Sequence, residues 1–397
     1  MRNLSGGNVT RLLVVGGGIA GTGAALALHK AGHDVAVYEA HPDSAEDIGA
    51  FLTLASNGMR ALAEVDASAA VTSIGFPLTS MRVLDDTGAE IAQVPLGEAG
   101  TPHLRYRCVR RGDLNAALQA EVTGRGIGIR HDMRLVSVDD GPENGVTAHF
   151  ADGTTATGDL LIGADGLSST VRGLTAPDRR PVYSGQQVFY GYTRQAPPAA
   201  RPETITMVRG SAVAFGYAVS PEGETYWFAR VAGEPLAAAD IEHAGPAHLR
   251  DLLLPLLGKD STPAADLVAA TSDDLMVTNA TELPTGTPWR SGRTLLIGDA
   301  AHAASPATGQ GASMALEDAV VLAKSLRDAP DTDTGLSLYE TLRRPRVEHN
   351  VTVSGNISRG THNPSERRPG GGAPTRPGDD ELAGHLEWDT ELRLPAT

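Results

Sequence analysis

Residues 12–21, LLVVGGGIAG, decide the fold of the first part of this chain. The four apolar residues predict a buried strand, and Gly16, Gly18 and Gly21 follow with the spacing G-x-G-x-x-G. The first glycine permits a tight turn, the second lets a pyrophosphate approach the backbone, and the third lets the next helix pack closely on the strand. We expect that helix over residues 19–30, with the free amides of Ile19 and Ala20 available to phosphates.

A second predicted strand, residues 34–38, ends in Glu39, 18 positions after Gly21. A carboxylate at this point suits the hydroxyl pair of a ribose and disfavours a ribose phosphate. The β-α-β unit therefore predicts a dinucleotide site, and it does not decide between FAD and NAD. The alternative is a glycine turn in a sheet that binds no nucleotide.

Two later segments repeat the order strand, acidic turn, helix. They are residues 159–166, DLLIGADG, and residues 295–300, LLIGDA, the second of which is followed by Pro306, Gly309 and Gly311. Asp299 ends its predicted strand, where it could bind sugar hydroxyls or cap the next helix. Apolar residues on one face predict a helix over residues 312–326. Turns about 280 residues apart thus describe a chain folded around one long cofactor.

The middle of the chain has a different sequence pattern. Short alternating segments at residues 188–194, 212–219 and 225–231 predict an antiparallel sheet inserted into an α/β protein. We assign residues 1–72, 103–178 and 286–357 to a nucleotide-binding domain and residues 73–102 and 179–285 to a substrate-binding sheet. Pro345 is expected to end or kink a helix over residues 339–347. The composition of residues 358–397 predicts a flexible tail with a short docked piece near residues 385–392.

Composition excludes several classes of protein. The formal charge of −15 disfavours a nucleic-acid partner, and the single cysteine, Cys108, excludes disulfides within the chain. The apolar run at residues 12–28 is short for a membrane span, and no cleavage-like segment follows it. We expect a cytoplasmic protein without a membrane span. We find no convincing catalytic triad or metal-ligand cluster, so no metal is expected.

Three segments together resemble the FAD-dependent aromatic hydroxylases, single-component flavoprotein monooxygenases of the para-hydroxybenzoate hydroxylase fold. They are Gly16–Gly21 with Glu39, residues 159–172 (DLLIGADGLSSTVR) and residues 294–318 (TLLIGDAAHAASPATGQGASMALED). The resemblance covers roughly residues 10–350. It implies an α/β fold in which a Rossmann-like FAD-binding domain carries an inserted antiparallel sheet. The family commonly has a basic residue after the ribose-binding acid, whereas Ala40 and His41 follow Glu39 here.

The resemblance also implies roles for individual residues. Glu39 would hold the adenosine ribose, Arg111 the pyrophosphate and Asp299 the ribityl hydroxyls, while main chain near Leu135 would touch the adenine. Asp165 belongs to a segment associated with the pyrophosphate and with pyridine-nucleotide use. The residues implied beside the isoalloxazine ring are Pro306, Gly309, Gly311 and Ala312. One of these assignments competes with an ordinary structural role, since Arg111 could pair with Asp113 or Glu121. His302 is expected to be a hydrogen-bond partner and not a base.

The implied reaction needs no protein nucleophile, so no catalytic residue is assigned. NADH or NADPH would reduce FAD, oxygen would give a flavin hydroperoxide, and an electron-rich aromatic or polycyclic molecule would be hydroxylated or epoxidised, in secondary metabolism or aromatic catabolism. The alternatives are an FAD-dependent dehydrogenase or reductase of the same fold and a non-enzymatic flavin-binding protein. Candidate pocket residues on the predicted sheet are Tyr190, Tyr192, Arg194, Phe215 and Tyr217; each could equally belong to an ordinary sheet core.

Overall fold

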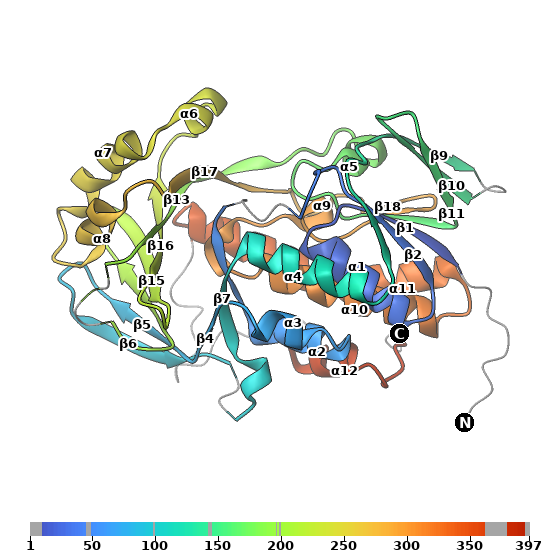
Figure 1. The fold of residues 1–397 in the computed structure, drawn as a ribbon, viewed down its shortest axis with the longest axis horizontal. Coiled ribbons are helices and arrows are strands. Elements are labelled where there is room, and N and C mark those ends of the chain that lie inside the picture. Colours follow the sequence, from blue (N-terminus) through green and yellow to red (C-terminus); the bar gives the residue numbers. More distant parts are fainter. Residues whose placement is uncertain are drawn as a thin grey trace.

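A six-stranded sheet carries the N-terminal glycine motif (Figure 1). The computed structural model describes residues 10–44, 49–97, 100–141, 145–195, 197, 200–361 and 379–393. All neighbouring strands of the sheet are parallel except the edge pair β18–β19. In spatial order the strands are β18 (Arg290–Ser291), β19 (Thr294–Leu296), β12 (Leu160–Gly163), β1 (Arg11–Val15), β2 (Asp34–Tyr38) and β8 (Gly128–Arg130).

The order of the central strands places three distant segments side by side. β1 lies between β2 and β12, and β12 pairs with β19, so Val15 lies opposite both Tyr38 and Gly163, and Gly163 lies opposite Leu296. Parallel strands end at the same edge of a sheet, which is where α/β proteins bind their ligands. The turns after β1, β12 and β19 therefore lie together at one edge.

Helices pack around this sheet because small residues let them approach. On α1 (Ile19–Lys30), a Cβ atom at Gly23 would lie 3.0 Å from the Leu316 side chain of α10 (Gly311–Asp328). Leu26, Leu28 and Leu322 have no exposed surface and join the main core with the strands. The other helices of this part are α2 (Ser56–Glu64), α3 (Ser68–Thr72), α4 (Arg111–Gly124), α5 (Thr170–Thr175), α9 (Asp299–His302) and α11 (Thr332–Ser358).

Two small sheets flank the central sheet. One contains β11 (Thr155–Gly158), β10 (Gly145–Phe150) and β9 (Leu135–Gly141), all antiparallel. The other contains β3 (Phe51–Leu54), β7 (Tyr106–Arg110) and β4 (Phe76–Leu78). The second sheet leads directly into α2 and α4, so it joins the nucleotide-binding part to the inserted sheet.

The inserted sheet has seven strands and is antiparallel apart from one pair. In spatial order they are β17 (Leu275–Glu282), β13 (Val182–Thr193), β16 (Thr225–Ala232), β15 (Val213–Val219), β14 (Thr204–Arg209), β5 (Ser80–Leu84) and β6 (Glu90–Pro95). The β14–β5 pair is parallel, which the prediction of an antiparallel sheet did not include. That prediction also missed three helices, which lie beside the sheet in Figure 1: α6 (Ala238–His243), α7 (Pro246–Leu257) and α8 (Ala264–Ala270).

The prediction that a helix ends at Pro345 is wrong, because α11 runs through Pro345 to Ser358. A kink at this residue stays a prediction. Proline removes one backbone hydrogen bond and usually interrupts a helix. Here Arg343, Val347 and Val351 are almost completely buried, so packing on both sides of the proline holds the helix. Within the described residues no helix is both long and apolar enough to cross a membrane.

The predicted flexible tail is wrong for residues 379–393. They form α12 (Asp379–Leu386) and a following segment, and Leu386 and Leu392 are buried in the main core. Lys324 of α10 donates hydrogen bonds to the carbonyl oxygens of Gly384, His385 and Glu387. The expected docked piece at residues 385–392 thus lies within a longer docked segment, while residues 362–378 and 394–397 lie outside the described residues.

Candidate functional site

Three turns meet at one edge of the six-stranded sheet, and their contacts require glycine. Gly16 has a φ of +107°, and a Cβ atom there would lie 2.4 Å from the carbonyl oxygen of Ala164. Gly298 has a φ of +57°, and a Cβ atom there would lie 2.7 Å from Cβ of Ala20. A side chain at either position would push the turns apart. The structure therefore brings the three predicted turns together.

The N-terminus of α1 is open above Gly18. This residue precedes the helix without a capping side chain, and a Cβ atom added to it would meet no atom within 4 Å. By contrast, a Cβ atom at Gly21 would lie 1.8 Å from the carbonyl oxygen of Gly16. The three glycines thus have the distinct surroundings that the motif predicts. The free amides of Ile19 and Ala20 and the helix dipole make this opening fit a pyrophosphate.

Glu39 lies at the edge of this opening. Its Oε2 accepts a 2.5 Å hydrogen bond from the main-chain nitrogen of Gly17, and its Oε1 accepts one of 2.7 Å from the nitrogen of His41. The main-chain nitrogen of Met133 donates to the Glu39 carbonyl at 2.8 Å, which brings the segment before Leu135 beside the same turn. The His41 ring pairs with Asp43 at 2.9 Å. The site thus presents a carboxylate together with main chain, as an adenosine ribose and adenine require.

The Asp165 carboxylate forms hydrogen bonds within its own segment. It accepts a 2.5 Å hydrogen bond from the Ser169 hydroxyl and one of 3.0 Å from the Val171 nitrogen at the start of α5. Burial raises the pKa of Asp165, and these hydrogen bonds oppose the rise. Arg172 is buried and donates to the Ala300 carbonyl at 3.0 Å, tying this segment to the turn that carries Asp299. The Asp165 carboxylate therefore holds the turn after β12 together.

Gly298 is the N-cap of α9 and Asp299 is its first helical residue, so the helix-cap alternative for Asp299 is not what the structure shows. The turn behind it is held by Asp318, whose Oδ2 accepts from the Gly298 nitrogen at 3.0 Å and lies 2.6 Å from Nε2 of His302. Burial opposes ionisation of Asp318, but the charges of His302 and Arg343 lower its pKa to about 2. His302 is therefore a structural partner, as expected.

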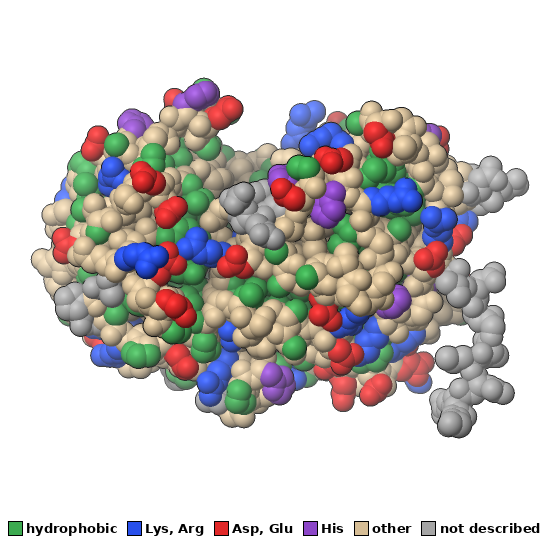
Figure 2. Space-filling view, in the orientation of Figure 1, with side chains coloured by type: hydrophobic (Ala, Val, Ile, Leu, Met, Phe, Trp, Pro, Cys, Tyr) green, Lys and Arg blue, Asp and Glu red, His purple; other side chains and the backbone are tan. Residues whose placement is uncertain are grey.

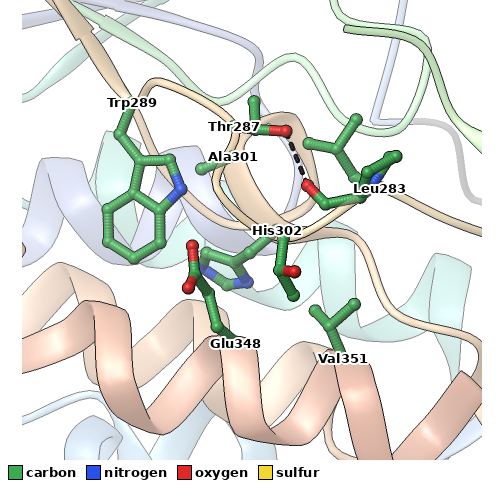
Figure 3. A pocket seen from close by; sticks show the side chains of 9 residues that line it. Leu283, Thr287, Trp289, Ala301, His302, Glu348 and Val351 are labelled. Carbon is green, nitrogen blue, oxygen red and sulfur yellow. Dashed lines mark hydrogen bonds between the residues drawn. The ribbon is translucent and has the colours of Figure 1, made fainter.

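The other side of His302 faces a small depression (Figure 3). Trp289, Glu348 and Val351 surround its ring. The Trp289 ring centroid lies 5.5 Å from that of His302, and Arg344 stacks on Trp289 at 4.2 Å. The depression lies where α9 packs against α11, and it is separate from the turns described above.

The segment from Pro306 to Ala312 leads from α9 into α10. Pro306–Thr308 make one 3-10 turn (η2), Gly309 follows with a φ of +64°, and α10 begins at Gly311. A Cβ atom at Gly311 would lie 3.9 Å from Oδ1 of Asp299. The N-terminus of an 18-residue helix thus lies beside Asp299, where its dipole favours negative charge.

One face of the inserted sheet gathers aromatic side chains near β3. Phe51 lies 6.3 Å from Tyr190, 6.3 Å from Tyr192 and 6.2 Å from Phe228, measured between ring centroids. The Tyr192 hydroxyl donates to the Gly49 carbonyl at 3.0 Å. Burial raises the pKa of Tyr190 to about 12, with Arg230 and Arg111 opposing the rise. Tyr190 and Tyr192 are thus placed together on the side of the sheet toward β3.

Two of the other pocket candidates, Phe215 and Tyr217, are corrected. Phe215 and Tyr217 lie on the opposite face, in a core shared with Trp227, Leu249 and Leu253. Phe215 stacks on Trp227 at 5.4 Å, so both candidates pack under α7 and α8. Arg194 follows the last residue of β13 and is exposed. The alternation of residues defines two faces for each strand, but helices that the sequence analysis missed decide which face is covered.

Sequence analysis missed Arg110, the neighbour of Arg111. The Arg110 guanidinium lies 3.9 Å from the Tyr192 ring centroid and forms a 2.8 Å ion pair with Glu224. Arg111 begins α4 with an exposed side chain, and Glu121 pairs with Arg125 instead. The Arg110-Arg111 doublet was the available signal in the sequence, because Arg110 ends β7 and Arg111 begins α4.

Comparisons with known proteins agree with this geometry. Residues 9–354 match the family described as FAD binding domain. The chain is 32% identical over 348 residues to aurachin C monooxygenase/isomerase of Stigmatella aurantiaca, covering 86% of this chain and 87% of that one. It is 32% identical over 353 residues to 3-amino-4-hydroxybenzoate 2-monooxygenase of Streptomyces platensis, covering 86% and 85%.

A solved structure supports the same assignment. HpxO of Klebsiella pneumoniae, complexed with FAD and uric acid, has a TM-score of 0.80 and 26% identity, covering 98% of this chain and 95% of that one. The predicted fold class, FAD as cofactor with NAD(P)H as the usual reductant, and an oxygen-inserting enzyme in preference to a dehydrogenase are thereby confirmed. The chain belongs to the single-component FAD-dependent aromatic hydroxylases and is an FAD-dependent monooxygenase.

Proposed function

We propose that this enzyme hydroxylates a small, electron-rich aromatic or polycyclic compound with NADH or NADPH and molecular oxygen. One observation carries the proposal. The aromatic face of β13 and β16 is joined to the η2 turn, because Arg230 of β16 contacts the Ala307 carbonyl at 3.4 Å. Tyr190 and Phe228 lie on that face. An aromatic wall beside the turn expected to hold the isoalloxazine ring suits an aromatic substrate.

The FAD supplies electron transfer and oxygen activation when bound, and the protein supplies orientation and electrostatics. In this proposal the amides after Gly18 bind the pyrophosphate, Glu39 accepts from the adenosine ribose, and Asp299 accepts from the ribityl chain. The N-terminus of α10 stabilises negative charge on the reduced ring, by roughly 0.3–1 kcal/mol or more where it is buried. The remaining assigned contacts are Gly16, Ile19, Ala20, Gly21, Arg111, Leu135, Asp165, Pro306, Gly309, Gly311 and Ala312.

The role of the inserted sheet is to hold the substrate and exclude water. Tyr192 is buried, and its hydroxyl is already bonded to Gly49, so it forms a fixed wall. Tyr190 is partly exposed and can reach a ligand. The names of two similar proteins support a small ring compound: one acts on 3-amino-4-hydroxybenzoate, and the other was solved with uric acid. A dry site matters because water diverts the activated oxygen into peroxide.

The test is incorporation of oxygen. Purified holoenzyme is supplied with NADH or NADPH and a panel of phenols, aminobenzoates and polycyclic aromatics under ¹⁸O₂, and products are analysed by mass spectrometry. We expect one labelled oxygen atom in the product and oxygen uptake equal to substrate consumed. A parallel reaction in labelled water should give no label. Substrate that loses two hydrogens without gaining labelled oxygen would overturn the proposal.

Several finer assignments stay predictions. They include epoxidation in place of hydroxylation, a role in secondary metabolism or aromatic catabolism, and the domain boundaries given from the sequence. A cytoplasmic location and the lack of a nucleic-acid partner also stay predictions. On the face shown in Figure 2, acidic and basic side chains are interspersed.

A further inference from the structure

A row of buried polar side chains lies on the part of α11 that follows Pro345. Asn350, Ser354 and Ser358 are spaced four residues apart, so they share one face of the helix. All three are buried. Buried polar groups need hydrogen-bond partners, and all three find them in the same short segment, residues 305–308. One face of α11 therefore holds the segment that contains η2.

Ser354 joins the two ends of this segment. Its hydroxyl donates to the Ser305 carbonyl and accepts a 3.3 Å hydrogen bond from the Thr308 nitrogen. The Thr308 hydroxyl in turn donates to Oδ1 of Asn350 at 3.0 Å. The hydroxyls of Ser305 and Ser358 are hydrogen-bonded to each other. The residue before η2 and its last residue are thus both bonded to α11.

The η2 turn buries none of its own three residues. Within the turn, the Gly309 nitrogen donates to the Pro306 carbonyl at 3.0 Å, and Arg230 adds the 3.4 Å contact with Ala307. A segment with few buried apolar contacts opens easily unless its hydrogen bonds hold it. The position of η2 therefore depends on the polar groups of α11.

The same face of α11 also reaches the residue that precedes α10. Arg346, one helical turn earlier, donates from Nε to Oε2 of the fully buried Glu317 at 2.9 Å. Oε1 of Glu317 accepts from Nδ2 of Asn57 at 2.6 Å, and this nitrogen also donates to Oε1 of Gln310 at 3.1 Å. Both ends of the segment 305–310 are thus connected to one helix.

We propose that Asn350 and Ser354 are positioning residues for the flavin, because they fix the turn beside which the isoalloxazine ring lies. This rests on the proposed function, which assigns Pro306 and Gly309 to that ring. The two side chains act through the turn and do not touch the cofactor. Since the protein around a flavin tunes its electronic properties, loss of these hydrogen bonds changes the state of the bound ring.

The test uses oxidised holoenzyme without substrate. In Ser354→Ala and Asn350→Ala we expect the resolved shoulders of the flavin absorption band, a signature of rigid surroundings, to be lost. The rate at which FAD dissociates should rise at least fivefold. Thr225→Val is the matched control, because it removes a buried hydroxyl that donates to the Gln195 carbonyl at 2.8 Å in the inserted sheet. It should lower the melting temperature to a similar extent and leave the flavin spectrum and the dissociation rate as in the wild type.

Two results would overturn the assignment. One is a wild-type flavin spectrum and dissociation rate in both α11 variants, which would mean that these hydrogen bonds serve the fold alone. The other is an equal change in Thr225→Val, which would mean that any loss of stability disturbs the flavin. Neither measurement requires oxygen transfer. A failure of ¹⁸O incorporation together with the expected spectral change would contradict the proposed function and leave the positioning role standing.

Discussion

Nε2 of His302 lies 2.6 Å from Oδ2 of Asp318, and the same oxygen accepts a 3.0 Å hydrogen bond from the nitrogen of Gly298. Nε of Arg343 donates to Oδ1 of Asp318 at 2.8 Å. One fully buried carboxylate of α10 therefore fixes the turn that carries Asp299, the helix after it and α11. His302 is a positioning residue, because its ring is committed to this contact.

This network should make stability fall in acid. The folded-state pKa of Asp318 is about 2, below its ordinary value of 3.8, so its contribution is present above about pH 4 and lost as the pH falls toward 2. The shift corresponds to about 2 kcal/mol. Denaturant unfolding from pH 5 to pH 2.5 measures it. His302→Gln keeps a donor but removes the charge, so its loss between these pH values should be smaller; an identical loss would contradict this account.

Gly18→Ala and Gly16→Ala should separate cofactor binding from folding. At Gly18 the new methyl group meets no protein atom within 4 Å, so the protein without FAD should unfold within about 1 kcal/mol of wild type. The methyl group would occupy the space proposed for the pyrophosphate, so the Kd for FAD should rise at least tenfold. Fluorescence titration with FAD measures this. Wild-type affinity in Gly18→Ala would refute the placement.

Gly16→Ala is the contrasting variant. Its φ of +107° and the 2.4 Å approach to Ala164 require the turn itself to shift. We expect a loss of folding stability, seen as a lower melting temperature already in the absence of FAD. If Gly16→Ala melts like the wild type and only binds FAD weakly, the turn is not as tightly packed as described.

Local chemistry made part of the site predictable from the sequence. The functions of Gly16, Gly18 and Gly21 follow from the space around a strand–helix turn, which the motif itself determines. The faces of the inserted sheet were not predictable in that way. Tyr190 and Phe215 both lie on alternating strands, and only the position of α7 and α8 buries one and leaves the other toward β3.

Long-range packing explains the other differences. Pro345 predicts a break that the burial of Arg343 and Val351 overrides. The Pro- and Gly-rich composition after residue 358 predicts a flexible tail. Leu386 and Leu392 are nevertheless buried in a core formed by residues far earlier in the chain. Neither result could be read from neighbouring residues alone.

Phe215→Ala should affect folding and not the flavin. The side chain has no exposed surface and stacks on Trp227, so its removal should cost about 3–5 kcal/mol of unfolding free energy. The Kd for FAD should stay within twofold of wild type. Tyr192→Phe, which loses only the bond to Gly49, should cost about 1 kcal/mol. Chemical denaturation measures the two changes in unfolding free energy, and FAD titration measures the Kd. Weaker flavin binding in Phe215→Ala would show that Phe215 lies in the pocket after all.

The docked C-terminal segment should depend on Lys324. Its ammonium group has no exposed surface and donates to the carbonyl oxygens of Gly384, His385 and Glu387, which lie at the end of α12. Lys324→Met keeps the length of the side chain but leaves these carbonyls without their donor, at a cost of about 1–3 kcal/mol. Hydrogen exchange at residues 379–393 should then become faster, while exchange in β1 and β12 stays unchanged. Lys259→Met, which removes an exposed lysine after α7 in the inserted domain, is the control and should leave exchange at residues 379–393 unchanged. Equal exchange at residues 379–393 in Lys324→Met and wild type would show that the burial of Leu386 and Leu392 alone holds the segment.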